Sequence, residues 1–322
     1  MSDVQTPAIP EPHPPLPQTT LQTPIVAAIL CLLFWQIAPR IRAESFIAFL
    51  ASSVLYMILI VWFASSLGRG LNTPRAILVS GIAAAAIAVP FRLMIGLRVP
   101  AGIWLYMALP GLSDILLVWL AGSIGAALSL LLRGANMIPP VAAVLALVDI
   151  WTVLLGGPVH QIMTSDNPAA RAATQAMTVQ LPAPRATGAA PSPLLVGFAD
   201  FLFIAFFIAA ICRFAPNGQA YKKTVAALLI VLSAYLLLVA SPIDFPAGLP
   251  ALVPTAVVMI AINWRHFHYD RSEAFALLYA GVFITLIAIA FWYLGRTPSK
   301  ASGQPTARIH WIPGQAAPRP VS

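Results

Sequence analysis

Three acidic residues lie inside long apolar stretches of the sequence, where a carboxyl group needs a specific reason to be present. They are Asp114, Asp149 and Asp200, whereas the other acids lie in tails, in loops or at the ends of apolar runs. A carboxyl group at the centre of a bilayer costs about 3 kcal/mol on insertion scales. Each of the three is therefore a candidate functional residue, and the alternative is that it only links neighbouring helices.

Asp149 and Asp200 form the pair with the clearest chemistry. They lie in "VLALVDIWTVL" and "LVGFADFLF", two consecutive apolar segments joined by a loop long enough to let them pack side by side. Two carboxyl groups brought together away from water cannot both ionise at low cost, so they share one proton and titrate in two macroscopic steps. The ionised group can then activate water while the protonated group polarises a carbonyl, which requires no metal, cofactor or covalent nucleophile.

Two other segments are expected to complete such a site. Gly197 permits a close backbone approach to Asp200 because glycine has no side chain. The stretch "GLPALVP" opens a later apolar run, and its residues Pro250 and Pro254 disfavour regular helix there. Irregular backbone at membrane depth occurs where it is buried in protein or lines a wet cavity. We therefore expect this stretch to hold an extended substrate by main-chain hydrogen bonds, as in strand addition.

The composition indicates which elements must position these residues. Of the 322 residues, 60% are hydrophobic and 9% are charged, and the mean hydropathy is +0.87. A soluble domain carries roughly a quarter charged residues, so an integral membrane protein is expected. The apolar runs are continuous and lack the alternation of a barrel, which predicts an all-α transmembrane bundle. About nine spans are expected, near residues 24–38, 45–67, 75–97, 104–132, 138–156, 193–214, 223–242, 248–264 and 273–295.

The remaining segments are polar or rich in proline. The two tails are expected to be disordered, and the loop at 164–192, which is rich in Ala, Pro, Ser and Thr, is expected to be a flexible linker. The net charge of +8 is spread over many loops, so no nucleic-acid partner is expected. The chain then divides into an N-terminal tail, 1–23, N-terminal helices, 24–134, catalytic helices, 138–264, an additional span, 273–295, and a C-terminal tail, 296–322.

Three motifs, taken in order, resemble those of presenilin and signal peptide peptidase, the GxGD intramembrane aspartyl proteases. That family carries "YD" on one helix, "GxGD" on the next and "PAL" two helices later. This chain has Val148-Asp149, then Gly197-Phe198-Ala199-Asp200, then Pro250-Ala251-Leu252. The stretches "GFADFLF" and "VDIWTVLLGGPVHQIM" are similar to the presenilin "GLGDFIF" and "YDLVAVL" stretches. The resemblance covers residues 138–263.

The resemblance implies a presenilin-like protease that hydrolyses peptide bonds within transmembrane segments of membrane proteins. Asp149 and Asp200 would be catalytic, and the implied substrate-binding residues are Gly197, Phe198, Leu249, Pro250, Ala251 and Leu252. No metal or cofactor is implied. The partners would be the substrate helix and the lipid bilayer, and a microbial-type member would lie in the plasma (inner) membrane of a prokaryote. The oligomeric state is not indicated.

Two departures from the family pattern provide the basis for an alternative. Val148 replaces the usual tyrosine, and Ala199 replaces the second glycine of GxGD. A non-catalytic membrane scaffold with the same fold is therefore a second hypothesis. A third is a proton- or cation-coupled transporter that uses both aspartates, although such proteins commonly contain repeated halves and none is found here.

Other polar positions are given structural interpretations. Asp114 is expected to make a polar contact between helices or to lie at the interface. His266, His268 and Asp270 alternate as metal ligands might, but their loop is rich in aromatic residues and Arg, which is typical of an interfacial anchor. His160 is expected at the membrane edge. The loop at 164–192 corresponds to the segment that presenilins cut in themselves, and a plain linker is the preferred interpretation.

Overall fold

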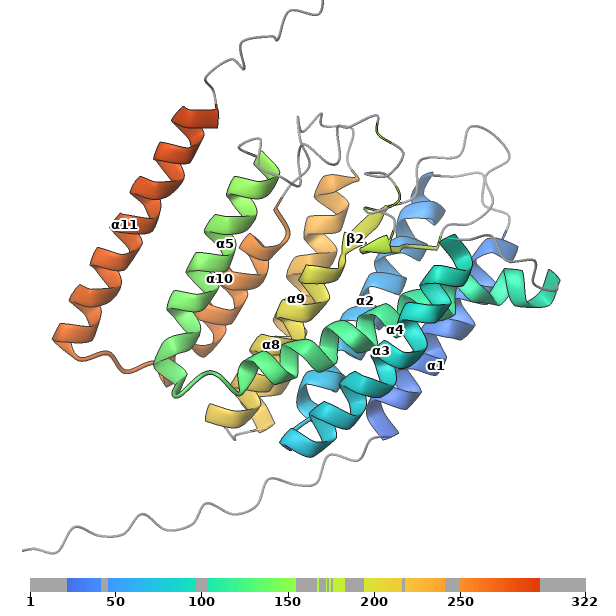
Figure 1. Ribbon diagram of the computed structural model, residues 1–322, viewed down its shortest axis with the longest axis horizontal. Helices are drawn as coiled ribbons and strands as arrows, with labels where there is room; N and C mark the ends of the chain where they lie inside the picture. Colours follow the sequence, from blue (N-terminus) through green and yellow to red (C-terminus); the bar gives the residue numbers. More distant parts are fainter. Residues whose placement is uncertain are drawn as a thin grey trace, which may run out of the picture.

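The computed structural model describes residues 22–41, 46–96, 103–154, 176–182, 194–215, 218–240 and 250–295, and positions 167, 172 and 174. Within these ranges the chain is almost entirely helical (Figure 1). The α-helices are α1 (Gln22–Ile37), α2 (Phe46–Gly70), α3 (Pro74–Gly96), α4 (Ile103–Ser129), α5 (Ile138–Leu154), α8 (Phe198–Phe214), α9 (Gly218–Val239), α10 (Leu252–Asn263) and α11 (Arg271–Gly295). Short 3-10 turns are η1 (Ala38–Arg40), η2 (Ala135–Met137) and η3 (Trp264–His266).

The length and composition of the helices make this an integral membrane protein. Six segments of the described chain are long and apolar enough to cross a bilayer: Gln22–Arg40, Phe46–Gly70, Pro74–Arg92, Gly111–Ser129, Ala135–Val153 and Gly218–Val239. An all-α membrane bundle is therefore confirmed. Helices α8 and α10 have 17 and 12 residues and are shorter than the usual span of about 20. The count of nine spans remains a prediction.

Each observed helix lies close to one expected span. The course of α4 agrees with its expected span, and the start of α8 differs from it. Helix α4 runs without interruption through Pro110 and Gly111, inside the span expected at 104–132. Helix α8 begins at Phe198, later than the expected start at 193, because Leu195–Gly197 forms a strand instead.

That strand corrects the description of 164–192 as only a flexible linker. Strand β1 (Thr178–Gln180) pairs antiparallel with β2 (Leu195–Gly197), and Thr178 lies opposite Gly197. The sheet is short, and its residue Val179 is fully buried. The ladder fixes the entry of the chain into α8, which carries Asp200.

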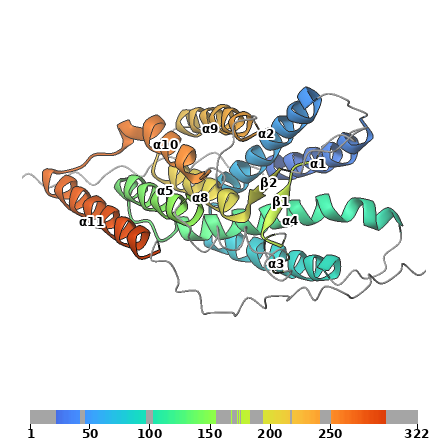
Figure 2. The ribbon, with the colours of Figure 1, turned by 90° about the horizontal axis from the view of Figure 1, so that it is seen from above.

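Helix α8 lies at the centre of the bundle and packs on α2 and α4 (Figures 1 and 2). Two glycines permit this close packing, because a Cβ at Gly125 of α4 would lie 2.9 Å from the backbone nitrogen of Phe206. A Cβ at Gly68 of α2 would likewise meet the backbone of Ala205. Small residues at helix crossings let backbones approach in membranes. The expected N-terminal and catalytic helices therefore share one core rather than forming separate units.

The opposite end of the molecule is built differently. Helix α10 packs on α5 and α9, and α11 contacts α5 and forms the edge of the bundle (Figure 1). No described residue of α11 is buried, and Tyr279 is 72% exposed. This end is therefore thinly covered by protein.

Candidate functional site

Asp200 lies in the first turn of α8, where the backbone itself holds its carboxylate. Gly197 is the N-cap residue in extended conformation, and Asp200 is the third helical residue. The backbone N–H of Gly197 donates to Oδ2 of Asp200 over 3.1 Å. An acid in this position pairs an otherwise free N–H group and interacts favourably with the positive end of the helix.

The short sheet holds Gly197, the residue to which Asp200 is bonded, in place. The N–H of Phe198 donates to the carbonyl of Met177, and the N–H of Leu181 donates to that of Leu194, each over 2.9 Å. These bonds lie at the two ends of the β1–β2 ladder. The backbone of Gly197 is therefore held between a strand pair and a helix. A Cβ at Gly197 would lie 3.3 Å from Oδ2 of Asp200, so glycine leaves room for the carboxylate at this point.

Asp149 lies in the second half of α5 and contacts the PAL segment directly. Its Oδ2 accepts the backbone N–H of Leu252 over 2.8 Å. Leu252 is the first residue of α10, Ala251 is its N-cap, and Pro250 precedes the helix and is buried. The first N–H groups of a helix have no partner within it. Asp149 thus supplies from α5 the acceptor that the start of α10 lacks.

The structure brings the two aspartates into one site. Asp149 and Asp200 lie close enough to interact electrostatically, and Tyr235 of α9 lies within the same range of both. Both are partly buried. Each of the two bonds described above uses Oδ2 of its carboxylate. Paired carboxyl groups in a partly water-excluded site can perform acid–base chemistry without another group.

The two departures from the family pattern, one in the YD motif and one in GxGD, fall on exposed positions. The side chain of Val148 is 46% exposed, and Ala199 is also exposed. The methyl group of Ala199 therefore lies outside the core of the bundle. Phe198 is half-buried and packs against the main core. Leu249, the remaining predicted substrate-binding residue, lies outside the described residues.

Tyr235 and strand β1 were not anticipated from the sequence. Tyr235 is an aromatic residue with a hydroxyl group inside an otherwise apolar span, which is a weak signal for a polar neighbour. Strand β1 has the sequence "TVQ" and pairs with β2 in the register Thr178 to Gly197, Val179 to Val196 and Gln180 to Leu195. A segment of three residues with this composition cannot be distinguished from a loop by its sequence.

The other candidates have structural partners. Asp114 bonds to Arg92 of α3, which confirms the expected polar contact between helices. The backbone N–H of His268 donates to Oδ1 of Asn136 over 3.0 Å, and Tyr269 donates to the Asn136 carbonyl, so the loop before α11 is tied to η2. His160 lies outside the described residues. Within the part of the chain that the structure describes, no three His, Cys, Asp or Glu residues are grouped as metal ligands.

Comparisons with known proteins give no relative for this chain. No family model, no curated protein and no solved structure matches it. The functional assignment therefore depends on the geometry of the site and on the order of its motifs.

Proposed function

We propose that this protein is an intramembrane aspartyl protease that hydrolyses peptide bonds within transmembrane segments of other membrane proteins. The observation that supports it most is the convergence of three separated motifs. Asp149 and Asp200 come together from α5 and α8, and the PAL residue Leu252 donates its N–H to Asp149. This arrangement would place the catalytic pair beside the segment expected to hold substrate. The proposed location is the plasma (inner) membrane of a prokaryote.

The proposed reaction uses one shared proton. The ionised carboxylate accepts a proton from water while the water oxygen attacks the scissile carbonyl carbon, and the protonated carboxyl group donates to the carbonyl oxygen. As the tetrahedral gem-diol collapses and its C–N bond breaks, the carboxyl group that took the proton from water gives it to the leaving nitrogen, and the other carboxylate takes a proton from a hydroxyl group of the gem-diol. The pair then holds one shared proton again. The bond from Leu252 to Asp149 and the bond from Gly197 to Asp200 would hold the two groups in position.

Cleavage of a single-span reporter in lipid vesicles tests the proposal. We expect the wild-type protein to cut the reporter within its transmembrane segment, and Asp149→Asn and Asp200→Asn each to lower kcat by about 10²- to 10⁴-fold, the usual contribution of general acid–base catalysis. Asp270→Asn is the matched control because Asp270 is exposed in the loop before α11. Absence of wild-type cleavage against a panel of single-span reporters would contradict the proposal, and so would equal activity in all three variants.

The pH dependence of cleavage provides a second test. Activity requires one carboxyl group protonated and the other ionised, so kcat/KM is expected to rise and then fall as the pH increases. The rising and the falling part of this profile each report a macroscopic pKa of the coupled pair, and neither value can be assigned to one aspartate alone. The measurement is reporter cleavage over a pH series at constant ionic strength. A profile that stays flat from acid to neutral pH would exclude the shared-proton mechanism.

A further inference from the structure

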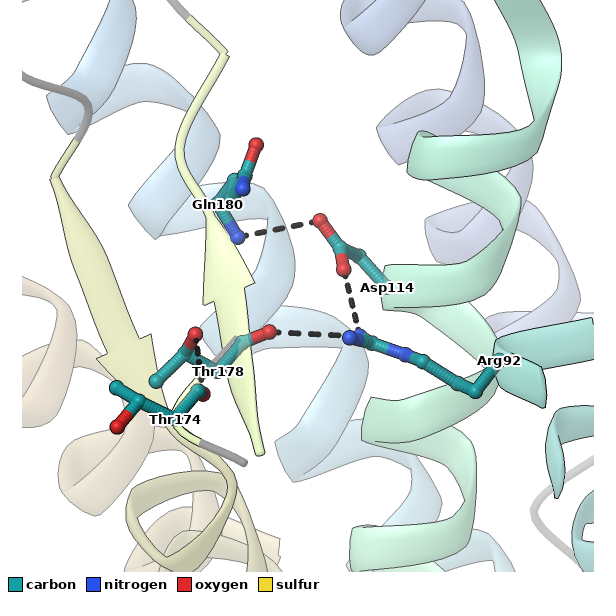
Figure 3. Close-up of polar contacts among 5 residues, drawn as sticks. All are labelled: Arg92, Asp114, Thr174, Thr178 and Gln180. Carbon is teal, nitrogen blue, oxygen red and sulfur yellow. Dashed lines mark hydrogen bonds and ion pairs between the residues drawn. The ribbon is translucent and has the colours of Figure 1, made fainter. Parts of the chain in front are cut away.

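A largely buried ion pair lies between α3 and α4, beside the sheet and outside the aspartate pair (Figure 3). Nη2 of Arg92 lies 2.8 Å from Oδ1 of Asp114, and the two side chains are 19% and 6% exposed. Removing two charges from water costs several kcal/mol each, so replacing such a pair with apolar residues is often neutral or stabilising. Stability alone is therefore a weak explanation for the pair.

The same two side chains also bind the backbone of β1. The N–H of Gln180 donates to Oδ2 of Asp114 over 3.1 Å, and Nη2 of Arg92 donates to the carbonyl of Thr178 over 3.4 Å (Figure 3). Asp114 thus uses one oxygen for Arg92 and the other for the strand. The ion pair is a three-way junction between α3, α4 and β1.

These contacts occupy the edge of β1 that faces away from β2. Leu181 donates to Leu194 across the sheet, and successive residues of a strand direct their backbone groups to alternate edges. The N–H of Gln180 and the carbonyl of Thr178 therefore point to the outer edge. Arg92 offers a donor to that carbonyl and Asp114 an acceptor to that N–H, which are the groups that a neighbouring strand would offer.

Two contacts connect this junction to Asp200 of the aspartate pair. Thr178, which is bonded to Arg92, lies opposite Gly197 in the β1–β2 register. Gly197 in turn donates its N–H to Asp200. A displacement of β1 would therefore move the backbone group that holds the Asp200 carboxylate.

We propose that Arg92 and Asp114 are positioning residues for Asp200, which hold β1 by its outer edge and thereby fix β2 and the start of α8. The structural part of this inference stands on the contacts above, and its catalytic consequence rests on the proposed protease function. A small misplacement of a catalytic group can lower the rate by about 10²-fold, so the pair has a route to affect turnover from a distance.

The exchanged pair Arg92→Asp/Asp114→Arg separates this role from simple cross-linking of α3 and α4. The exchange keeps an ion pair between the two helices. It places a donor against the N–H of Gln180 and an acceptor against the carbonyl of Thr178, so the bonds to β1 are lost. The apolar variant Arg92→Leu/Asp114→Leu removes both functions without leaving one charge buried. Ser80→Ala is the matched control, because Ser80 bonds to Ser123 and Trp119 between α3 and α4 without contacting β1.

Amide hydrogen exchange in lipid nanodiscs is the first measurement, because it does not depend on activity. We expect both double variants to exchange the peptides covering 176–182 and 194–200 at least about tenfold faster than wild type, while Ser80→Ala leaves both peptides unchanged. Retained wild-type protection in the exchanged pair would overturn the proposal, since the pair would then only join α3 and α4. Global unfolding is recognised separately by loss of protection in α9 and in the part of α8 after Asp200.

Reporter cleavage by the same variants is the second measurement. We expect kcat to fall about tenfold with KM within about twofold, because the reacting groups move while substrate contacts remain. Faster exchange with unchanged kcat would overturn the link to Asp200. If the wild-type protein cuts no reporter, the proposed function fails, and the exchange result still decides whether the ion pair holds β1 and Gly197.

Discussion

The two aspartates are carried by helices with contrasting surroundings. Every residue of α8 from Ile204 to Ile211 is buried, and the helix lies between α2 and α4. In the described part of α5, only Ile138 and Ala142 are buried, and both lie in its first two turns. Asp200 therefore belongs to the densely packed end of the molecule and Asp149 to the thinly covered end.

This difference gives the two aspartates different roles in one site: Asp200 is held precisely by a packed helix, and Asp149 lies where the protein can open for access. A reacting group held by a packed helix keeps its geometry, whereas elements with few buried contacts open at low free-energy cost. Within the thinly covered end, Asp149 is held by its bond to Leu252 at the start of α10. We therefore expect substitutions at the packed end to change stability and the geometry of Asp200, and substitutions at the thinly covered end to have small effects on stability.

Adding one methyl group to the packed end is expected to have the largest effect on stability. Alanine at Gly125 would place Cβ 2.9 Å from the backbone nitrogen of Phe206, and a backbone atom cannot rotate away. We expect Gly125→Ala to lower the free energy of unfolding by about 1–3 kcal/mol, as overpacking of a core does. The measurement is thermal or denaturant unfolding in lipid nanodiscs.

Gly281→Ala is the matched control for this change. Gly281 is also helical, and a Cβ there would meet no atom within 4 Å. Alanine in an exposed helix position is favoured over glycine by up to about 1 kcal/mol, so we expect no loss of stability. Equal destabilisation by both substitutions would contradict the difference in packing between the two ends.

Gly197→Ala is expected to have an intermediate effect, on catalysis rather than stability. The backbone of Gly197 suits alanine, but the new Cβ would lie 3.3 Å from Oδ2 of Asp200 and press on the carboxylate. We expect kcat to fall about tenfold while KM and the unfolding transition stay near wild type. The adjacent variant Ala199→Gly is the control, because Ala199 is exposed. Unchanged kcat in Gly197→Ala would show that the carboxylate position is not set at this point.

Thr224→Val is expected to have the smallest effect, and it tests the contact between α9 and α10. Nδ2 of Asn263 donates to Oγ1 of Thr224 over 2.9 Å, and both residues are buried. Side-chain hydrogen bonds within membranes contribute about 0.6 kcal/mol on average. We expect a loss of that size in unfolding measurements, and none for Thr285→Val, whose hydroxyl is exposed and bonds to Gly281 of its own helix. A loss above about 2 kcal/mol would mean that α10 depends on this bond far more than is usual in membranes.

The sequence was sufficient to predict the membrane bundle and the positions of its helices, because continuous apolar runs have few alternatives in a bilayer. It also paired Asp149 with Asp200 from their place in consecutive runs. The contact between Asp149 and Leu252 could not be predicted, because it depends on how α5 and α10 pack. Strand β1 was missed because three residues gain their strand conformation only from pairing with β2. The role of Asp114 was predicted only as a contact between helices, since its second oxygen binds a backbone group from a distant loop.

The most direct test of the central claim is binding of a hydroxyl-containing transition-state isostere of a peptide bond. Its hydroxyl should replace the attacking water between Asp149 and Asp200, so both carboxyl groups contribute to one interaction. We predict that Asp149→Asn and Asp200→Asn each weaken binding at least about tenfold, and that the double variant is little weaker than either single variant, as expected for coupled residues. Failure of the wild-type protein to bind, or full additivity of the two substitutions, would contradict a shared catalytic pair.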